Sequence, residues 1–247
     1  MRSKIGLNLT RNYSYNFSPT KRTKKLIKFI ILHYTGMRKE TDAIKKLCDY
    51  NSKVSSHYFI KNSGKILNLV PDLYVAWHAG KSKWKKFDSL NKYSIGIEIN
   101  NPGHEFGYNK FNSKQINSLK KLLSFLIKKY NIKADNVLGH SDIAPDRKKD
   151  PGEKFPWKKL AKKGLCKWHT LNRKNTKKSR SISVSDKEKK IFLNNLSKIG
   201  YNLKIKKIFD KNTRFIIIAY QRHFRQELID GKIDKECLLI SKNLTKS

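Results

Sequence analysis

Two histidines and one aspartate are placed where a folded chain could bring them together. His33 stands at the end of a short apolar stretch, His140 ends another, and Asp150 follows ten residues after His140. Neutral imidazoles and a carboxylate suit zinc, and a hydrolytic zinc site keeps three protein ligands and one open position. The spacing alone leaves another interpretation open, because a histidine at a strand end is more often a hydrogen-bonded structural residue.

Asp150 lies in the segment GHSDIAPDRKKDPGEKFPW. Prolines and glycines at this density fix the backbone of a loop, as is needed where a carboxylate must point at a metal. Hydrolysis at such a centre also needs a carboxylate to accept a proton from water and a cation to stabilise the oxyanion.

The surrounding pattern predicts elements that could position these residues. A β-branched run predicts a buried strand over Leu26–Ile31, and Tyr93–Ile99 alternates so that its isoleucines share one face, with Gly96 and Glu98 on the other. The fold class is therefore α/β. The same reasoning predicts a strand at 137–139, a hairpin of 57–60 with 66–70, a helix over 41–50 and a long helix capped by Ser113.

The composition changes after Trp168. Residues 169–184 are basic and poor in apolar side chains, which predicts an exposed linker. Three amphipathic stretches follow, so we expect an enzyme-sized domain over 1–168, the linker, and a small three-helix domain over 185–247.

The chain is strongly basic, with 56 Lys and Arg against 19 Asp and Glu and a net charge of +37. Such a field attracts anionic surfaces and polymers, although lysines on solvated faces explain it equally well. No motif for specific nucleic-acid binding accompanies the charge, and scattered lysines are a weak footprint. No apolar run is long enough to span a membrane. Three scattered cysteines suggest neither a disulfide framework nor a cysteine zinc site.

Five strings occur in an order that resembles a known family: ILHYTG, SSHYFI, AWHAG, SIGIEINN and the GHSDIAP segment. Together they resemble the amidase-2 family of N-acetylmuramoyl-L-alanine amidases, first its AmiD-like branch and then the AmpD-like one, over Asn16 to Trp168. The resemblance implies a central mixed β-sheet flanked by helices. It also implies zinc-dependent cleavage of the amide bond between N-acetylmuramic acid, in its ordinary or 1,6-anhydro form, and L-alanine in peptidoglycan or muropeptides. Such cleavage would serve cell-wall turnover or recycling.

The family's zinc ligands fall on His33, His140 and Asp150, its catalytic glutamate on Glu98, and its catalytic lysine on Lys148. By this resemblance Glu98 would take a proton from the attacking water, and Lys148 would stabilise the oxyanion.

Other matched positions suggest substrate contacts, and one position departs from the family. We expect His57 to pack inside the hairpin and Trp84 to be either a sugar platform or a surface aromatic, and Asp146 stands where the family usually has glycine. An additional carboxylate there would either weaken binding of an anionic substrate or point outward. The candidates for binding substrate are His78, Trp77, Asn100 and Tyr34.

The last domain resembles a peptidoglycan-binding three-helix module, through Gly200-Tyr201, Tyr220-Gln221 and Ile233-Asp234. The alternatives are a helical cap without a ligand and, for the whole chain, a non-catalytic peptidoglycan-binding protein of the same fold. We expect a monomer. The N-terminal residues lack the apolar stretch of a secretory signal, which favours a cytoplasmic setting, with the periplasm or cell envelope as the alternative.

Overall fold

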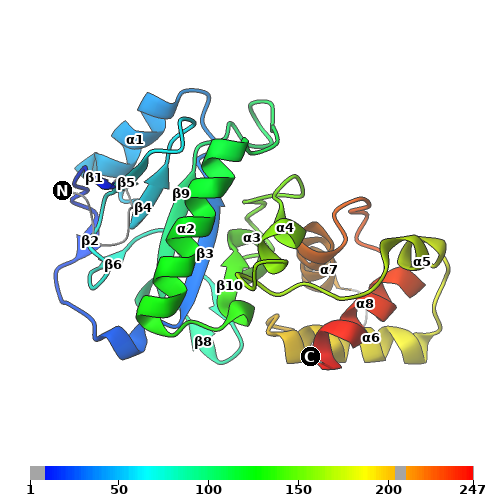
Figure 1. The fold of residues 1–247 in the computed structure, drawn as a ribbon. Coiled ribbons are helices and arrows are strands. Elements are labelled where there is room, and N and C mark those ends of the chain that lie inside the picture. The colour runs from blue at the N-terminus through cyan, green and yellow to red at the C-terminus, as the bar shows by residue number, and fades with distance from the viewer. Residues whose placement is uncertain (1–8, 204–209, 247) are drawn as a thin grey trace.

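A computed structural model describes residues 9–203 and 210–246 of the chain. Its N-terminal part is built around one β-sheet, and four helices from the C-terminal part lie beside it (Figure 1). Within the described residues, no helix has the length and apolar character needed to cross a membrane.

The central sheet has six strands and is mixed, as the resemblance implied. Strand β4 pairs antiparallel with β5 as the predicted hairpin, whereas β3 runs parallel to both β9 and β10. In spatial order the strands are β1 (Leu9–Arg11), β5 (Ile66–Asn68), β4 (Tyr58–Ile60), β9 (Ser94–Ile99), β3 (Phe29–Tyr34) and β10 (Val137–Gly139).

Strand β3 begins and ends later than the apolar run predicted. Leu26 belongs to a short 3₁₀ helix, Lys24–Leu26, while His33 and Tyr34 lie inside the strand. The reason is strand pairing. Strand β3 pairs with β9 from Phe29, opposite Ser94, to Tyr34, opposite Ile99, and backbone pairing includes polar residues such as His33 as readily as apolar ones.

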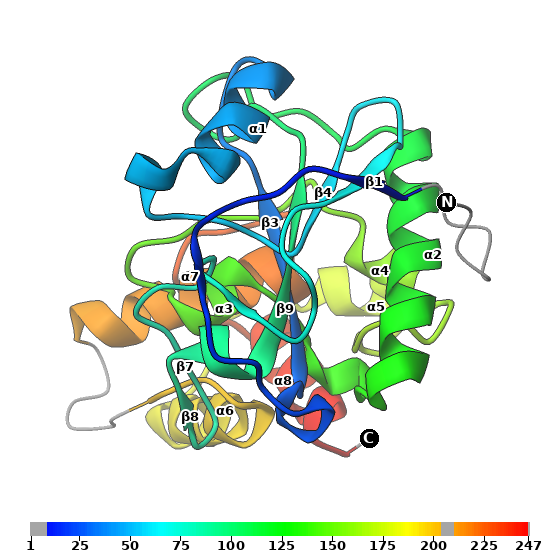
Figure 2. The ribbon, with the colours of Figure 1, turned by 90° about the vertical axis from the view of Figure 1, so that its left-hand side faces the viewer.

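Helix α2 (Ser113–Tyr130) covers one face of the sheet (Figure 2). Its leucines form a core with the isoleucines of β9, and burying each such side chain contributes roughly 1.5–3 kcal/mol. The N-cap is Asn112 rather than Ser113, because the Asn112 side chain accepts the Gln115 N–H while Gln115 bonds back to the Asn112 N–H.

The opposite face of the sheet is covered by two separate bodies. Helix α1 (Glu40–Cys48) packs near the hairpin, in a cluster that includes Phe59. The C-terminal helices pack on the other end of the face, in a cluster that includes Phe29, Ile31 and Leu138. Figure 2 shows both bodies on the side of the sheet away from α2, with a stretch of the face between them.

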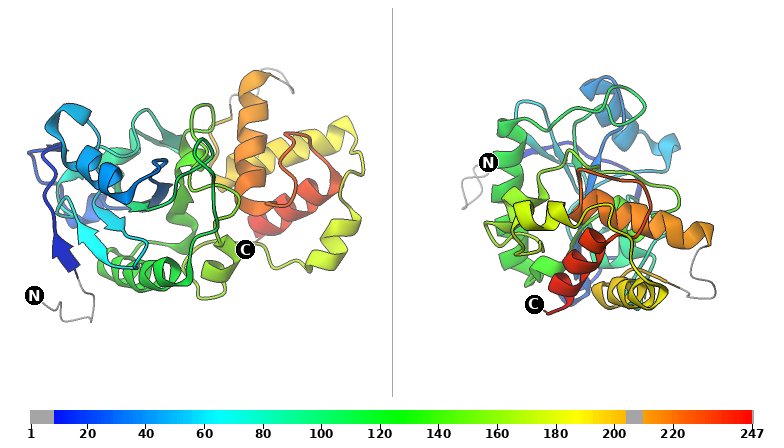
Figure 3. Two further views of the ribbon diagram at one scale, coloured as in Figure 1. Left: turned by 90° about the horizontal axis from the view of Figure 1, so that it is seen from above. Right: turned by 90° about the vertical axis from the view of Figure 1, so that its right-hand side faces the viewer.

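The C-terminal part contains the three helices predicted there, preceded by a short one. Ser185 caps the first of the three with a capping box, and Asp210 caps the second. Helix α7 lies closest to the N-terminal part in the view from above (Figure 3). The helices are α5 (Arg173–Lys178), α6 (Asp186–Ile199), α7 (Lys211–Phe224) and α8 (Lys235–Lys246).

Most side chains of the predicted linker, residues 169–184, are exposed, but the segment packs against α8. It contains α5, whose Thr176 is buried, and Arg180 forms an ion pair with Glu236 of α8.

The remaining elements are β2 (Phe17–Ser18), β6 (Val75–Ala76), β7 (Lys83–Trp84), β8 (Phe87–Asp88), α3 (His140–Ile143), α4 (Trp157–Ala161) and 3₁₀ turns at 50–52, 90–93 and 134–136.

Candidate metal and active site

The chemistry-bearing residues form a row across the open stretch of the sheet. His33 of β3 stands in register with Glu98 of β9, and Glu98 stands in register with Phe59 of β4. Side chains in register on neighbouring strands share a face. His140 follows β10 directly as the first residue of α3, so it reaches the same end of the sheet.

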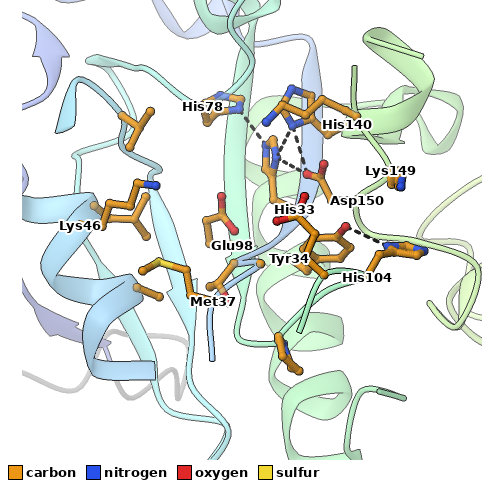
Figure 4. Close-up of a pocket in the computed structure, with 18 of the residues that line it drawn as sticks. His33, Tyr34, Met37, Lys46, His78, Glu98, His104, His140, Lys149 and Asp150 are labelled. Atoms are coloured by element: carbon orange, nitrogen blue, oxygen red, sulfur yellow. Dashed lines mark hydrogen bonds and ion pairs between the residues drawn. The ribbon is translucent and has the colours of Figure 1, made fainter. Parts of the chain in front are cut away.

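Three side-chain atoms converge at this end. His33 Nδ1 lies 2.9 Å from Asp150 Oδ2 and 3.0 Å from His140 Nδ1, and His140 Nδ1 lies 3.1 Å from Asp150 Oδ2 (Figure 4). All three residues are buried, and they form the group in the described chain that could hold a metal ion. The three predicted ligands are therefore brought together.

Hydrogen bonds on the far side of each imidazole determine which nitrogen carries the proton. His140 Nε2 lies 3.2 Å from the carbonyl oxygen of Ala79. A carbonyl only accepts, so Nε2 is the protonated nitrogen and Nδ1 of the neutral ring carries a lone pair.

The same reasoning applies to His33 through a chain of contacts. The Ser94 hydroxyl donates to the Leu90 carbonyl at 2.6 Å, so it accepts from His78 Nε2 at 3.2 Å. His78 Nδ1 is then an acceptor for His33 Nε2, 3.1 Å away, and His33 Nδ1 carries a lone pair. Two lone pairs and a carboxylate oxygen thus face each other about 3 Å apart, an arrangement that a cation stabilises and that fits zinc.

Burial sets the protonation of this cluster. It lowers the pKa of His33 to about 4, with a further contribution from His140, so the ring is neutral near pH 7. Burial raises the pKa of Asp150, but a proton on a neighbouring imidazole, in the place that a metal ion would take, outweighs burial and holds this pKa below its usual range. Neutral imidazoles and an ionised carboxylate are the forms that bind zinc.

Glu98 has a different environment. Burial, and then the charge of Asp150, raise the pKa of Glu98 well above its ordinary value, while Lys148 lowers it. Its Oε2 is buried and has no hydrogen-bond partner among the described residues. Figure 4 shows the carboxyl group beside His33 on the pocket side of the sheet. A buried carboxyl without a structural partner is a candidate for acid–base chemistry.

A cavity of about 340 Å³ opens above this row. It is lined by the metal-site residues and Glu98, by Tyr34 and Trp77, and by four basic side chains: Lys46, Arg147, Lys148 and Lys149. Cations at its rim would attract an anionic substrate.

The predicted substrate-binding residues divide into two groups. Tyr34, Trp77 and His78 line the cavity, although both ring nitrogens of His78 are already engaged by His33 and Ser94. Asn100 is not among the lining residues. It is buried, and its side chain accepts a weak bond from the Thr35 hydroxyl at 3.4 Å.

Three other expectations have structural outcomes. His57 is fully buried in the hairpin region, as predicted, and its Nδ1 accepts the Gly96 N–H at 3.0 Å. Asp146 is exposed and lines a different hollow beside the C-terminal helices, so it points outward. Trp84 is neither a sugar platform nor a surface aromatic, because it is only 1% exposed and packs edge-on against Tyr201.

Sequence reasoning missed the residues that hold the predicted ones in place. His104 lies between Tyr34, whose hydroxyl is 2.9 Å from Nδ1, and Glu153, 3.1 Å from Nε2. Arg147 donates to the same Ala79 carbonyl that orients His140. His104 follows soon after the SIGIEINN string, so its place near Glu98 could have been predicted from the sequence. The role of a backbone carbonyl such as that of Ala79 could not, because it does not depend on the residue type.

Comparison with known proteins identifies the family. The model of the family Amidase_2, described as N-acetylmuramoyl-L-alanine amidase, matches residues 22–153, a span that contains the whole row of candidate residues. The chain belongs to this amidase family. It is 36% identical over 231 residues to the N-acetylmuramoyl-L-alanine amidase AmiD of Escherichia coli K12, covering 88% of this chain and 82% of AmiD.

Other members of the amidase family match over smaller or similar spans. AmpD of Haemophilus influenzae, a 1,6-anhydro-N-acetylmuramyl-L-alanine amidase, is 36% identical over 111 residues, which are 44% of this chain and 58% of AmpD. The structure of E. coli AmiD bound to anhydro-N-acetylmuramic acid-L-Ala-D-γ-Glu-L-Lys superposes with a TM-score of 0.80 at 33% identity, over 93% of this chain and 92% of that one. Pseudomonas aeruginosa AmpDh3, bound to an anhydromuramic pentapeptide, superposes with a TM-score of 0.78 at 31% identity, over 93% and 94%.

Proposed function

We propose that this amidase holds zinc with His33, His140 and Asp150 and hydrolyses the amide bond between N-acetylmuramic acid and L-alanine in muropeptides. The observation that carries the proposal is the meeting of two imidazole lone pairs and a carboxylate beside the unpartnered carboxyl of Glu98. Bound zinc would supply a Lewis acid that polarises the scissile carbonyl and makes water more acidic.

Glu98 is proposed as the general base and acid. Its carboxyl group shares the pocket with the metal-site residues and has no structural bond to lose when it accepts a proton. A nearby divalent cation would lower the raised pKa of Glu98 again, because it favours the ionised form. Glu98 would accept a proton from the attacking water and then deliver it to the leaving amine.

Lys148 is proposed to stabilise the oxyanion. Its side chain lines the same cavity, and its charge is close enough to lower the pKa values of both Glu98 and His33. A cation beside the scissile carbonyl stabilises negative charge that develops on its oxygen in the transition state.

Trp77 and Tyr34 are proposed to contact the substrate, because both line the cavity and remain partly exposed. For His78 and Asn100, substrate contact stays a prediction from the sequence. The basic rim suits the carboxylates of a cell-wall peptide. Complexes of the relatives AmiD and AmpDh3 with anhydromuramoyl peptides support a muropeptide as the substrate class.

The division into a catalytic domain over 1–168, a linker over 169–184 and a peptidoglycan-binding module over 185–247 stays a proposal. The helices α6, α7 and α8 support its architecture, and binding of a glycan by them is part of the same proposal. Which sugar form the enzyme accepts would distinguish a role in wall turnover from one in fragment recycling.

The experiment is a comparison of metal-free and zinc-reloaded protein on two substrates. One substrate is a muramoyl peptide with an ordinary sugar, and the other is its 1,6-anhydro form. Cleavage releases a peptide with a free L-alanine amine, which an amine-reactive dye and mass spectrometry detect. We expect activity that is lost on chelation and restored by zinc, and Asp150→Asn protein that zinc does not restore.

Absence of new amine in the zinc-loaded sample would refute hydrolysis. If that sample still bound peptidoglycan, the non-catalytic alternative would be supported. Full activity in chelator would refute the metal while leaving the amidase assignment intact.

A further inference from the structure

Helix α7 belongs to the C-terminal module, yet it contacts the segments next to His140 and Asp150, and a chain of side chains links it to Tyr34, the residue after His33. We propose that α7 is a structural part of the active site, with His223 and Arg222 acting as positioning residues for the metal ligands. The inference rests on the proposed zinc site and adds a role for the C-terminal module other than binding a glycan.

The first contact holds the segment that carries His140. Asp142, in the turn of α3, is 2% exposed and accepts three hydrogen bonds. Two come from the C-terminal part: His223 Nδ1 at 2.8 Å and the Tyr201 hydroxyl at 2.7 Å. The third comes from the N–H of Gly139 at 2.8 Å, the residue directly before His140. A buried carboxylate needs such partners, so losing His223 would loosen the turn that aims His140.

The second contact holds the segment after the aspartate ligand. The His223 ring, 3% exposed, is stacked between Trp157 at 3.8 Å and Phe224 at 3.9 Å. Gln226, just beyond α7, donates to the carbonyl of Phe155 at 2.7 Å. Both Phe155 and Trp157 lie in the stretch that leads away from the DPG turn, so α7 limits how that turn can move.

The third contact reaches the residue next to His33. Arg222 Nε lies 3.7 Å from Glu153 Oε2, which lies 3.1 Å from His104 Nε2. His104 Nδ1 in turn lies 2.9 Å from the hydroxyl of Tyr34, which lines the cavity. Because Glu153 only accepts, His104 donates to it through Nε2 and accepts the Tyr34 hydroxyl proton at Nδ1.

The interface around these contacts is apolar and continuous with the core. Phe29, Ile31 and Leu138 of the sheet share one buried cluster with Ile217 and Phe224 of α7. A module that is merely tethered has a small and more polar interface with its neighbour. Here the module closes one end of the sheet face on which the metal site stands.

The test measures metal binding in the full chain. We expect His223→Phe to weaken zinc binding by about 10-fold, measured in competition with a chromophoric chelator. Loss of a direct hydrogen-bond partner of a ligand costs about 10–100-fold, and His223 acts one bond further out, through Asp142. The cobalt-loaded protein should show a changed visible spectrum, since its bands report ligand geometry. His223→Asn should recover both, because its amide N–H can donate to Asp142 in place of Nδ1.

Gln221→Leu is the matched control. Gln221 is the neighbouring buried residue of α7, but its amide bonds stay inside the module, to Asp230, Gly231 and Lys232. We expect this variant to lower the melting temperature and to leave zinc affinity and the cobalt spectrum unchanged.

Two results would overturn the inference: zinc affinity and cobalt spectrum unchanged in His223→Phe, or equal loss of affinity in Gln221→Leu and His223→Phe. Failure of the unmodified chain to bind zinc is a separate outcome that would remove the proposed metal site and this role of α7 with it.

Discussion

Gly96 lies against the ring of His78, and this contact makes Gly96→Ala an informative change. A methyl group at Gly96 would lie 2.4 Å from His78 Cγ, 2.6 Å from Cδ2 and 2.7 Å from Nδ1. Ordinary contacts at such a position begin at 3.4 Å, so the ring must withdraw by about 1 Å. The backbone of Gly96 is ordinary strand, and alanine by itself would stabilise the chain slightly.

The size of the effect follows from what the ring is bonded to. His78 Nδ1 lies 3.1 Å from His33 Nε2, so a shift of about 1 Å takes the pair beyond hydrogen-bonding distance. We expect Gly96→Ala to lower the free energy of unfolding by about 1–3 kcal/mol through overpacking. Zinc affinity should fall by about 10–100-fold, because His33 loses the partner that fixes its tautomer.

A double-mutant cycle with His78→Ala isolates the contact. In the His78→Ala background the three ring atoms that the methyl group would meet are gone, so Gly96→Ala should cost almost nothing, giving a coupling energy of about 1–3 kcal/mol. Denaturant unfolding of the four proteins, with and without zinc, provides the measurement. Equal costs of Gly96→Ala in both backgrounds, or zinc affinity unchanged by it, would refute the reasoning.

Three further predictions concern the pocket and its support. Glu98→Gln should keep zinc affinity and lose about 10²–10⁴-fold in kcat, measured by amine release, and loss of the metal instead would show that Glu98 is a ligand. Lys148→Met should lower kcat by about 10²–10³-fold with KM little changed, whereas a change confined to KM would assign Lys148 to substrate binding. Burial, and then Arg22, lower the pKa of His57 to about 3, so the unfolded chain binds the additional proton and stability falls as the pH drops below about 6.5. Between pH 6.5 and 5 this amounts to about 2 kcal/mol, which denaturant unfolding of zinc-loaded protein should show and which His57→Gln should lack; equal pH slopes in the two proteins would contradict it.

The local sequence pattern predicted the structure correctly where the contacts of a single strand or helix determine it. The alternation of β9 predicted that Glu98 and Gly96 share a face opposite the isoleucines, and the isoleucines do lie in the core under α2. Helices α1, α2, α6 and α7 were predicted for the same reason, since each has an apolar stripe with a recognisable cap or end. Where neighbouring residues compete for a cap, as Ser113 and Asn112 do, the sequence pattern does not choose between them.

Contacts between segments far apart in the sequence could not be predicted from the local pattern. His78 was expected to line the groove, and its bond to His33 depends on a strand 45 residues away in the sequence. Trp84 looks like a surface aromatic in its own segment, but it is buried because Gly200, at the end of α6, packs on its ring. The extension of β3 to Tyr34 likewise depends on its ladder with β9.

The site occupies the part of the sheet face that α1 and the C-terminal helices leave uncovered. Its floor is therefore made by strands, one side is made by helix α1, and the other side is made by the segment from His140 to Asp150, behind which the C-terminal helices pack. An exchange of α1 with that of another amidase would alter one wall while leaving the row from Glu98 to His140 in place. Chimaeric enzymes made in this way could separate the choice of glycan or peptide from bond cleavage itself, and they offer a route to amidases with altered wall specificity.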